Sequence, residues 1–252
     1  MATLIRRIYH GYRYINEELS DPRTQDYFLI GSPWGCFSII AFYLYFVQDL
    51  GPNIMAKRKP FNLNRIIQIY DLIQIISCSY LFYKITRMVW LYFLMKVFDL
   101  VDTVFFVLRK KQQQVSFLHV YHHTGMTFGT WVVTKFLPGG HITFLGTINS
   151  FVHVVMYTHY LATSLRISKP WWKKYVTQLQ LTQFCMIMVH FILLVWAEDC
   201  GFPKWTAAVM IPQNLFMIMM FGDFYYKAYI KKRKSNANGV SSDLANGKLK
   251  SQ

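Results

Sequence analysis

Charged residues are scarce in this chain, and acidic ones are scarcer still. Charged side chains make up 15% of its 252 residues, below the roughly 25% that is typical of soluble domains. Only 12 residues are Asp or Glu, against 27 Lys and Arg, which gives a net charge of +15. This composition argues against an ordinary soluble domain and favours an integral membrane protein with basic loops.

Three further patterns are missing. The four cysteines show no CxxC spacing, so they predict neither a zinc site nor a disulfide scaffold; they are Cys36, Cys78, Cys185 and Cys200. Residues 1–27 lack the apolar core of a signal peptide. The basic residues lie between apolar runs and not in a stripe beside aromatic residues, so we do not expect nucleic acid as a partner.

Apolar residues are abundant, because 54% of the chain is hydrophobic and 18% is aromatic. A helix that crosses a bilayer needs about 20 mostly apolar residues. Seven such stretches predict an all-α integral membrane protein with seven transmembrane helices, at residues 33–50, 63–83, 88–108, 115–136, 143–164, 175–196 and 205–229. Residues 1–32 are then an N-terminal segment, 33–230 the transmembrane domain, and 231–252 a polar tail that we expect to be disordered.

The distribution of Lys and Arg orients the seven stretches. The connections after the first, third, fifth and seventh stretches hold 16 Lys and Arg, and the other side holds eight. Positive residues favour the cytosolic side, so we expect a cytosolic C-terminus and a lumenal segment 1–32. The tail carries Lys248 and Lys250 in a terminal K-x-K-x-x pattern, which is typical of endoplasmic reticulum retrieval signals. We therefore expect a multi-pass protein of the endoplasmic reticulum membrane.

Ionisable residues inside the third stretch indicate a functional site, because such residues are expensive in a bilayer. Lys96, Asp99 and Asp102 repeat every three residues and share a helix face. Lys96 and Asp99 can pair, which leaves Asp102 to accept a hydrogen bond from a histidine. The alternative is a buried ion pair with a structural role only.

The fourth stretch begins with three histidines, His119, His122 and His123. Their i, i+3 and i+4 spacing places all three rings on one helix face. Three imidazoles on one face can serve acid–base chemistry, nucleophilic chemistry or metal binding.

Further polar residues lie in the fifth and sixth stretches. His153, Tyr157 and Tyr160 share a face, whereas His159 points elsewhere. The remaining polar positions, which can also act as hydrogen-bonding links between helices, are Asn149, Ser150, Gln180 and Gln183. With the predicted orientation, all four polar motifs fall between the middle of the bilayer and its cytosolic surface. They predict one buried polar chamber that a polar substrate enters from the cytosol.

These motifs resemble those of the very-long-chain fatty acid elongases, membrane condensing enzymes that join malonyl-CoA to an acyl-CoA. The matching signatures are Lys96-x-x-Asp99-x-x-Asp102-Thr103, Gln114-x-x-Phe117-Leu118-His119-x-Tyr121-His122-His123, Asn149-Ser150-x-x-His153-x-x-Met156-Tyr157 and Thr177-x-x-Gln180-x-x-Gln183. H-x-x-H-H alone is ambiguous, but four signatures in order are specific. Two features depart from the family: Asp99 stands where Glu is frequent, and the connection at residues 83–89 is short.

The resemblance implies a fold in which six of the seven helices form a barrel around an acyl tunnel, with the first helix outside. It also implies the first step of elongation, in which acyl-CoA and malonyl-CoA give 3-oxoacyl-CoA, CO2 and CoA through a histidine acyl-imidazole. By motif position the nucleophile is His122, and His153 stabilises the enolate. Asp102 or a neighbouring histidine would orient His122.

The resemblance also assigns residues and partners. The implied catalytic residues are Lys96, Asp99, Asp102, His119, His122, His123 and His153. The implied substrate-binding residues are Arg109, Gln114, Asn149, Tyr157, Tyr160, Gln180 and Gln183. It implies no cofactor and no metal, with the two CoA esters as substrates. The expected partners are the lipid bilayer, other enzymes of the elongation cycle and a second copy of this chain.

Three alternatives compete with this interpretation. A di-iron desaturase also has H-x-x-H-H boxes, but it needs about eight histidine ligands, and five at most can meet here; a metal assay separates the two. A seven-span receptor or transporter accounts for the spans but not for the histidines. A cysteine nucleophile, as in soluble condensing enzymes, would have to be Cys185, which lies deep in the sixth stretch.

Overall fold

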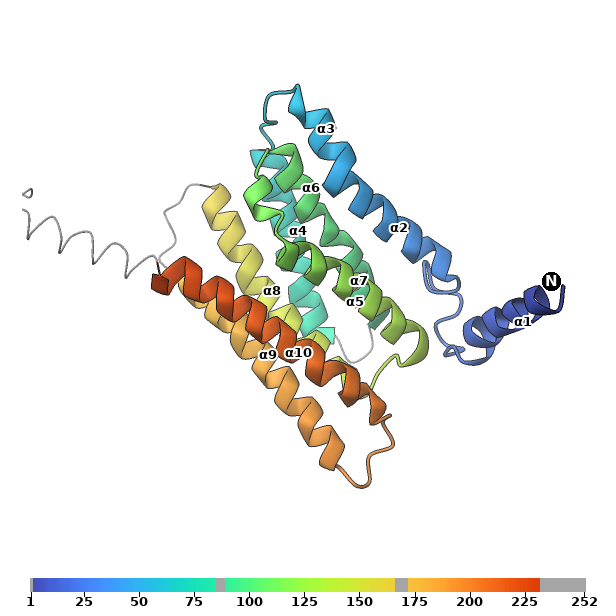
Figure 1. The fold of residues 1–252 in the computed structure, drawn as a ribbon. Coiled ribbons are helices and arrows are strands. Elements are labelled where there is room, and N and C mark those ends of the chain that lie inside the picture. Colours follow the sequence, from blue (N-terminus) through green and yellow to red (C-terminus); the bar gives the residue numbers. More distant parts are fainter. Residues whose placement is uncertain (1, 85–88, 166–171, 232–252) are drawn as a thin grey trace, which may run out of the picture. The chain divides into compact units, whose positions relative to one another are not determined.

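The computed structural model describes residues 2–84, 89–165 and 172–231, and these residues form only helices and loops (Figure 1). The α-helices are α1 (Ala2–Arg13), α2 (Pro33–Tyr45), α3 (Gly51–Ala56), α4 (Asn64–Lys84), α5 (Val89–Phe98), α6 (Leu100–Leu108), α7 (Phe117–Phe136), α8 (Ile142–Ser164), α9 (Lys173–Trp196) and α10 (Trp205–Tyr225). The chain divides into two compact units, Met1–Lys169 and Pro170–Gln252. The predicted tail signal at Lys248 and Lys250 lies outside the described residues.

Each predicted apolar stretch is helical, and capping residues explain where two of the helices begin. Ser32 precedes α2 and accepts a hydrogen bond from the Trp34 N–H (3.4 Å). Ser116 precedes α7 and accepts from the His119 N–H (3.3 Å). Serine is favoured at this position because its hydroxyl satisfies a backbone donor that the first turn leaves unpaired.

Three of the predicted stretches are not single α-helices, and the seventh continues from α10 into a π-helix, Tyr226–Lys231. The first continues from α2 through a π turn, Phe46–Leu50, into α3, so the helical path extends past residue 50. The third divides at Asp99 into α5 and α6. Residues 89–108 are therefore two α-helices separated by a single residue, and the span predicted here stays a prediction.

Within the described ranges, two helices are long and apolar enough to cross a membrane by length and composition. They are Lys173–Trp196, with mean hydropathy 1.8, and Trp205–Lys231, with mean hydropathy 1.3. Only 28% of the most apolar 18-residue segment of the first helix is buried, and only 17% of that of the second, as expected for helices that face lipid. The helices of the first unit carry polar residues or are interrupted, so the seven spans and the six-helix barrel stay predictions.

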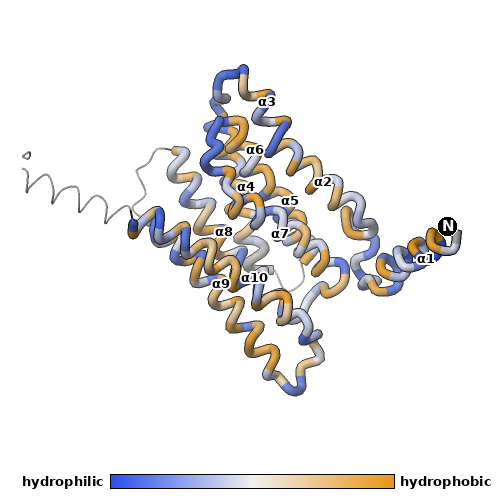
Figure 2. Tube along the Cα trace, in the orientation of Figure 1, coloured by the Kyte–Doolittle hydropathy of each residue, from blue (hydrophilic) through white to orange (hydrophobic). Residues whose placement is uncertain are grey.

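The helix α4 is polar on its buried side and apolar on its exposed side. Tyr70, Asp71 and Gln74 are buried, whereas Ile69 and Ile76 are exposed. Helices of soluble proteins have the opposite pattern, with the polar face outward. An outward apolar face fits contact with lipid, and Figure 2 shows the apolar colouring along the helices of both units. The buried polar side of α4 packs along α8.

A close approach between α3 and α6 requires glycine at position 51. A Cβ atom added to Gly51 would lie 2.7 Å from the carbonyl oxygen of Phe46 and 2.7 Å from a methyl group of Val107. Any larger residue would therefore push α3 away from α6. The two helices lie on the same side of the first unit as the start of α7.

The N-terminal segment is bound to the end of α7 by a set of contacts that we call the N-terminal clamp: residues 28–31 held by Trp90, Trp131 and Lys135. The Lys135 ammonium is fully buried and donates to the carbonyls of Ile30 (3.0 Å) and Gly31 (3.1 Å). The Trp131 indole donates to the Leu29 carbonyl (2.9 Å), and the Trp90 indole to the Phe28 carbonyl (3.2 Å). The clamp therefore fixes this segment at the C-terminal end of α7.

A second contact adjoins the clamp. The Asp21 N–H donates to the Lys135 carbonyl (2.8 Å). The Arg23 guanidinium hydrogen-bonds to the Asp21 carboxylate (2.7 Å) and lowers the pKa of that carboxyl. The segment before α2 is thus ordered by defined polar contacts.

Candidate active site

The site is built around the break between α5 and α6. Asp99 lies at this break, and its N–H still bonds to the Met95 carbonyl (2.8 Å). The break leaves the Lys96 carbonyl without its helical partner, and the Thr127 hydroxyl of α7 donates to it (3.1 Å). The Tyr70 hydroxyl of α4 donates to the Phe98 carbonyl (3.4 Å). Neighbouring helices therefore satisfy the interrupted backbone, as buried backbone groups require.

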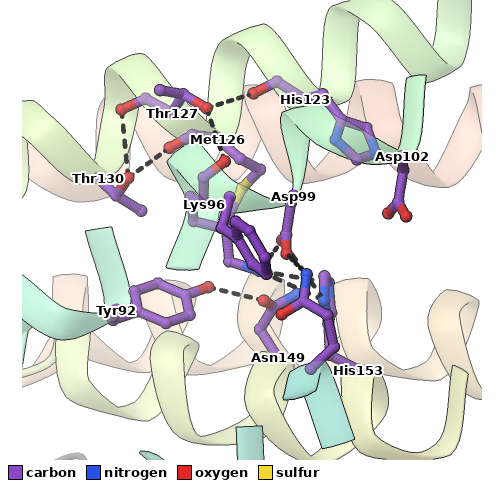
Figure 3. A network of polar contacts seen from close by, with 12 residues as sticks. Tyr92, Lys96, Asp99, Asp102, His123, Met126, Thr127, Thr130, Asn149 and His153 are labelled. Carbon is purple, nitrogen blue, oxygen red and sulfur yellow. Dashed lines mark hydrogen bonds and ion pairs between the residues drawn. The ribbon is translucent and has the colours of Figure 1, made fainter. Parts of the chain in front are cut away.

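Lys96 and Asp99 form a buried ion pair, so the pairing predicted from their spacing is confirmed. The Lys96 Nζ lies 2.8 Å from Asp99 Oδ2, and both side chains are only 4% exposed. Figure 3 shows His153 of α8 pointing at the same pair. Its Nδ1 lies 3.5 Å from Asp99 Oδ2, and the Lys96 Nζ lies 3.4 Å from its Nε2. Ammonium, carboxylate and imidazole thus meet at one point.

The second oxygen of Asp99 is held from two other helices. The Gln74 amide of α4 donates to Asp99 Oδ1 (2.7 Å), and the Tyr157 hydroxyl of α8 lies 3.1 Å from it. Gln74 is completely buried, and its amide nitrogen also lies 2.8 Å from the Tyr70 hydroxyl. These contacts leave Asp99 little freedom to rotate. Sequence analysis missed Gln74, although a glutamine one turn after Asp71 in an apolar stretch is a usable signal.

Asp102 differs from its prediction. In the described part of the chain its carboxylate accepts a hydrogen bond from the Tyr157 hydroxyl (2.8 Å), and not from a histidine. The hydrogen bond from a histidine that the spacing predicted for Asp102 is therefore not formed within the described residues, and the group that orients His122 stays a prediction. Asp102 lies in the first turn of α6, and the Tyr157 hydroxyl of α8 occupies its Oδ2.

The three histidines lie in the first two turns of α7, as predicted. The ring centroids of His119 and His123 are 4.1 Å apart, and those of His122 and His123 are 5.7 Å apart. The His119 Nε2 lies 2.9 Å from the Thr103 hydroxyl, which lies 2.8 Å from the Tyr43 hydroxyl of α2. The predicted site did not include Tyr43. It connects α2 to the histidine cluster through one threonine.

The polar residues of α8 have separate surroundings. The Tyr92 hydroxyl of α5 donates to Asn149 Oδ1 (2.8 Å), so Asn149 links two helices. Tyr160 is partly exposed, and its ring centroid lies 5.9 Å from that of Tyr157. His159 is buried next to Tyr160 and lies off the face of His153, as its spacing predicted.

The other predicted binding residues lie at the end of α6, in the turn that follows it, and in α9. Arg109 ends α6, where its Nη2 lies 3.5 Å from Asn64 Oδ1, and Gln114 is exposed in the following turn. Burial and the nearby charge of Arg109 lower the pKa of the Lys111 ammonium. Gln180 and Gln183 belong to α9 of the second unit, where Gln183 is buried.

The geometry suits chemistry on a carbonyl group. Lys96 and His153 present hydrogen-bond donors that a developing oxyanion needs, and Asp99 fixes both. The adjoining imidazoles of α7 include candidate nucleophiles and bases. No group of three His, Cys, Asp or Glu residues in the described ranges is arranged to hold a metal ion.

Comparison with known proteins gives a consistent result. The family described as "ELO: GNS1/SUR4 family" matches residues 28–88 and 83–237. The chain is 36% identical to very long chain fatty acid elongase 7 of Drosophila melanogaster, over 96% of this chain and 83% of that protein. It is 36% identical to elongase 4 of Homo sapiens, over 100% and 90% of the two chains. Elongase 1 of Mus musculus is also 36% identical, over 85% and 88%.

Proposed function

The chain belongs to the ELO (GNS1/SUR4) family and is a membrane protein of fatty acid elongation, and on this basis we propose that it condenses a long-chain acyl-CoA with malonyl-CoA. The products are 3-oxoacyl-CoA, CO2 and CoA, so the enzyme is a 3-oxoacyl-CoA synthase. The observation that carries this proposal is the buried Lys96–Asp99–His153 cluster beside the histidines of α7.

The reaction proceeds in two halves. In the first half the His122 imidazole attacks the carbonyl carbon of acyl-CoA, the C–S bond breaks and the CoA thiolate leaves, which gives an acyl-imidazole that keeps its second N–H and so carries a positive charge. In the second half malonyl-CoA loses CO2, and the electron pair of the broken C–C bond forms an enolate. The enolate carbon attacks the acyl-imidazole carbonyl, and the imidazole leaves as the new C–C bond forms.

The roles of the buried cluster follow from its contacts. His153 and Lys96 stabilise the negative oxygen of the enolate by hydrogen bonding. Asp99 keeps Lys96 and His153 in place, and Gln74 and Tyr157 keep Asp99 in place. Of the two orienting groups that the resemblance allowed, we favour a neighbouring histidine, His123, whose ring centroid lies 5.7 Å from that of His122.

The remaining proposals concern binding and location. Substrate contacts come from Arg109, Gln114, Asn149, Tyr160, Gln180 and Gln183. We infer seven spans with six of them around an acyl tunnel, a cytosolic C-terminus and residence in the endoplasmic reticulum. The reaction needs no cofactor or metal besides the two CoA substrates. Other elongation-cycle enzymes and a second copy of the chain are the proposed protein partners.

Radiolabelled malonyl-CoA tests the reaction directly. Membranes that contain the protein are incubated with the label and a panel of acyl-CoAs of increasing length, and labelled 3-oxoacyl products are separated by chromatography. We expect product only when both substrates and the protein are present. Lack of product with every acyl-CoA, from membranes in which the folded protein is detected, would contradict the proposed activity.

The proposed location has its own test. Lys248→Ser with Lys250→Ser should let part of the protein leave the endoplasmic reticulum, because the terminal lysine pattern is lost. Imaging of a tagged protein measures the escape, and condensation in isolated membranes should not change. Unchanged retention would show that another part of the chain, or a partner, holds the protein there.

A further inference from the structure

The helix α1 has one apolar face and one basic face. Its apolar residues cover a continuous arc of about 140°, at 3.6 residues per turn, and are Leu4, Ile5, Ile8, Tyr9 and Tyr12. The opposite arc carries the basic residues Arg6, Arg7, His10 and Arg13, and α1 contains no acidic residue. This separation is typical of helices that lie in the plane of a membrane surface.

The apolar face of α1 is open in the structure. Leu4, Ile5 and Ile8 are 63%, 61% and 64% exposed. A soluble protein rarely leaves such a row of large apolar side chains uncovered. An isolated helix of 12 residues is also marginally stable in water, so α1 needs a partner surface to persist.

The N-terminal clamp determines at which end of the first unit α1 lies. The clamp binds residues 28–31 at the C-terminal end of α7, which is the end away from the histidines. The Tyr12 ring of α1 stacks on Trp34, with centroids 6.4 Å apart, and Trp34 is exposed at the start of α2. Tyr27 packs on Trp90 at the same end (5.1 Å). Aromatic residues gather in this way where a membrane protein meets the lipid headgroups.

We propose that α1 lies on the bilayer surface at this end of the first unit, with its apolar face between the lipid chains and its arginines on the phosphates of acidic phospholipids. Arg13 pairs with Glu17, so Arg6 and Arg7 supply the charge for the lipid. A second copy of α1 is a poorer occupant, because it would cover only the apolar face and, having no acidic residue, would leave Arg6 and Arg7 without an anionic partner. This role is independent of the condensation reaction.

Amide hydrogen exchange of residues 2–13 tests this placement in the full-length protein. The protein is inserted at one copy per nanodisc, made of phosphatidylcholine alone or with phosphatidylserine. We expect slow exchange that becomes slower with phosphatidylserine. Ile8→Glu should speed exchange roughly ten- to a hundredfold, since burying an isoleucine side chain is worth about that factor in an equilibrium. His10→Glu adds the same charge two residues away on the basic face and should stay close to the wild-type rate.

A second variant isolates the charge contribution. Arg6→Gln with Arg7→Gln should abolish the difference between the two lipid compositions while Ile8 keeps the helix on the bilayer. Exchange at the rate of an unfolded chain in wild-type nanodiscs would overturn the proposal, and so would equal effects of Ile8→Glu and His10→Glu. Protection that requires two copies per disc would show that the face binds a second chain instead.

Discussion

Two lysine–aspartate pairs in this chain have nearly the same length and opposite surroundings. Lys96 and Asp99 in the first unit are 2.8 Å apart and 4% exposed, whereas Lys227 and Asp223 in the second unit are 2.7 Å apart and 66% and 54% exposed. Water solvates the second pair, so its net contribution to stability is small. The first pair has lost its water, and a hydrogen bond from the Gln74 amide to Asp99 replaces part of it. The Lys–Asp distance therefore does not distinguish a buried site from a surface pair. What distinguishes Lys96 and Asp99 is that protein groups replace the water around them.

The same contrast separates whole helices. The α9 and α10 segments are apolar enough to be recognised as spans, whereas α4 buries Asp71 and Gln74 and is not. A helix that carries buried polar groups loses part of the apolar signal by which spans are found. In the first unit, therefore, polar residues at helical spacing indicate where the site lies. Mean hydropathy does not identify α4 there as a membrane-spanning helix.

The largest contrast between the units should come from two histidine substitutions. His122→Ala removes the proposed acyl acceptor, so condensation of labelled malonyl-CoA should fall to background while the protein still inserts and folds. His190→Ala, in α9 of the second unit, is the control and should keep most of the activity. Near-normal product from the His122 variant, measured at equal protein levels, would contradict its role as nucleophile.

The two ion pairs can be compared by removing one aspartate from each. Asp99→Ala leaves a buried ammonium without its partner, which should cost about 3–5 kcal/mol of stability and most of the activity. Asp223→Ala breaks an exposed pair and should cost roughly 0–1 kcal/mol. Thermal unfolding of both variants in the same detergent measures the difference. Equal losses would mean that burial does not distinguish the two pairs.

Two glutamines provide a smaller and more specific comparison. Gln74→Met removes a donor to the Asp99 carboxylate and should cost about 1–3 kcal/mol, because a buried acceptor loses its partner. Turnover should also fall, with the KM for malonyl-CoA unchanged, if Gln74 acts by holding Asp99. Gln178→Met in α9 removes a hydrogen bond to the uncharged Tyr225 hydroxyl (2.9 Å) and should cost about 0.5–1.5 kcal/mol. A change of KM alone would assign Gln74 to substrate binding instead.

The smallest effect is expected at the edge of the histidine cluster. Tyr43→Phe removes the hydroxyl that contacts Thr103 and should cost about 0.5–1.5 kcal/mol of stability with a modest loss of activity. Tyr225→Phe is the matching hydroxyl deletion in the second unit and should leave activity unchanged. An activity loss as large as that of His122→Ala would show that α2 takes a direct part in the chemistry.

Much of the site was predictable because helical spacing brings side chains together. The spacing of three residues predicted the Lys96–Asp99 pair, and the H-x-x-H-H spacing predicted that the histidine rings of α7 lie next to one another. The break at Asp99 was not predictable from local sequence, because no glycine or proline marks it. The Lys96 and Phe98 carbonyls beside the break accept hydrogen bonds from side chains of α7 and α4, which are distant in sequence.

Contacts between distant helices were the other limit of prediction. Tyr157 reaches Asp102, and Gln74 reaches Asp99, across helices whose relative rotation no single stretch of sequence specifies. The amphipathic pattern of α1 is visible in the sequence, but the pattern alone does not say what surface the helix lies against. The position of α1 beside Trp34 depends on the clamp, and hence on residues about a hundred positions away.

The N-terminal clamp also has a consequence for biosynthesis. Lys135 and Ile30, which it joins, are separated by 105 positions. At synthesis rates of about 5–20 residues per second, roughly 5–20 s pass between the emergence of the two partners. During that interval residues 28–31 have been made, but the donors Trp131 and Lys135 have not. The N-terminal segment is therefore the earliest part of the first unit to be synthesised and among the last to be fixed in place.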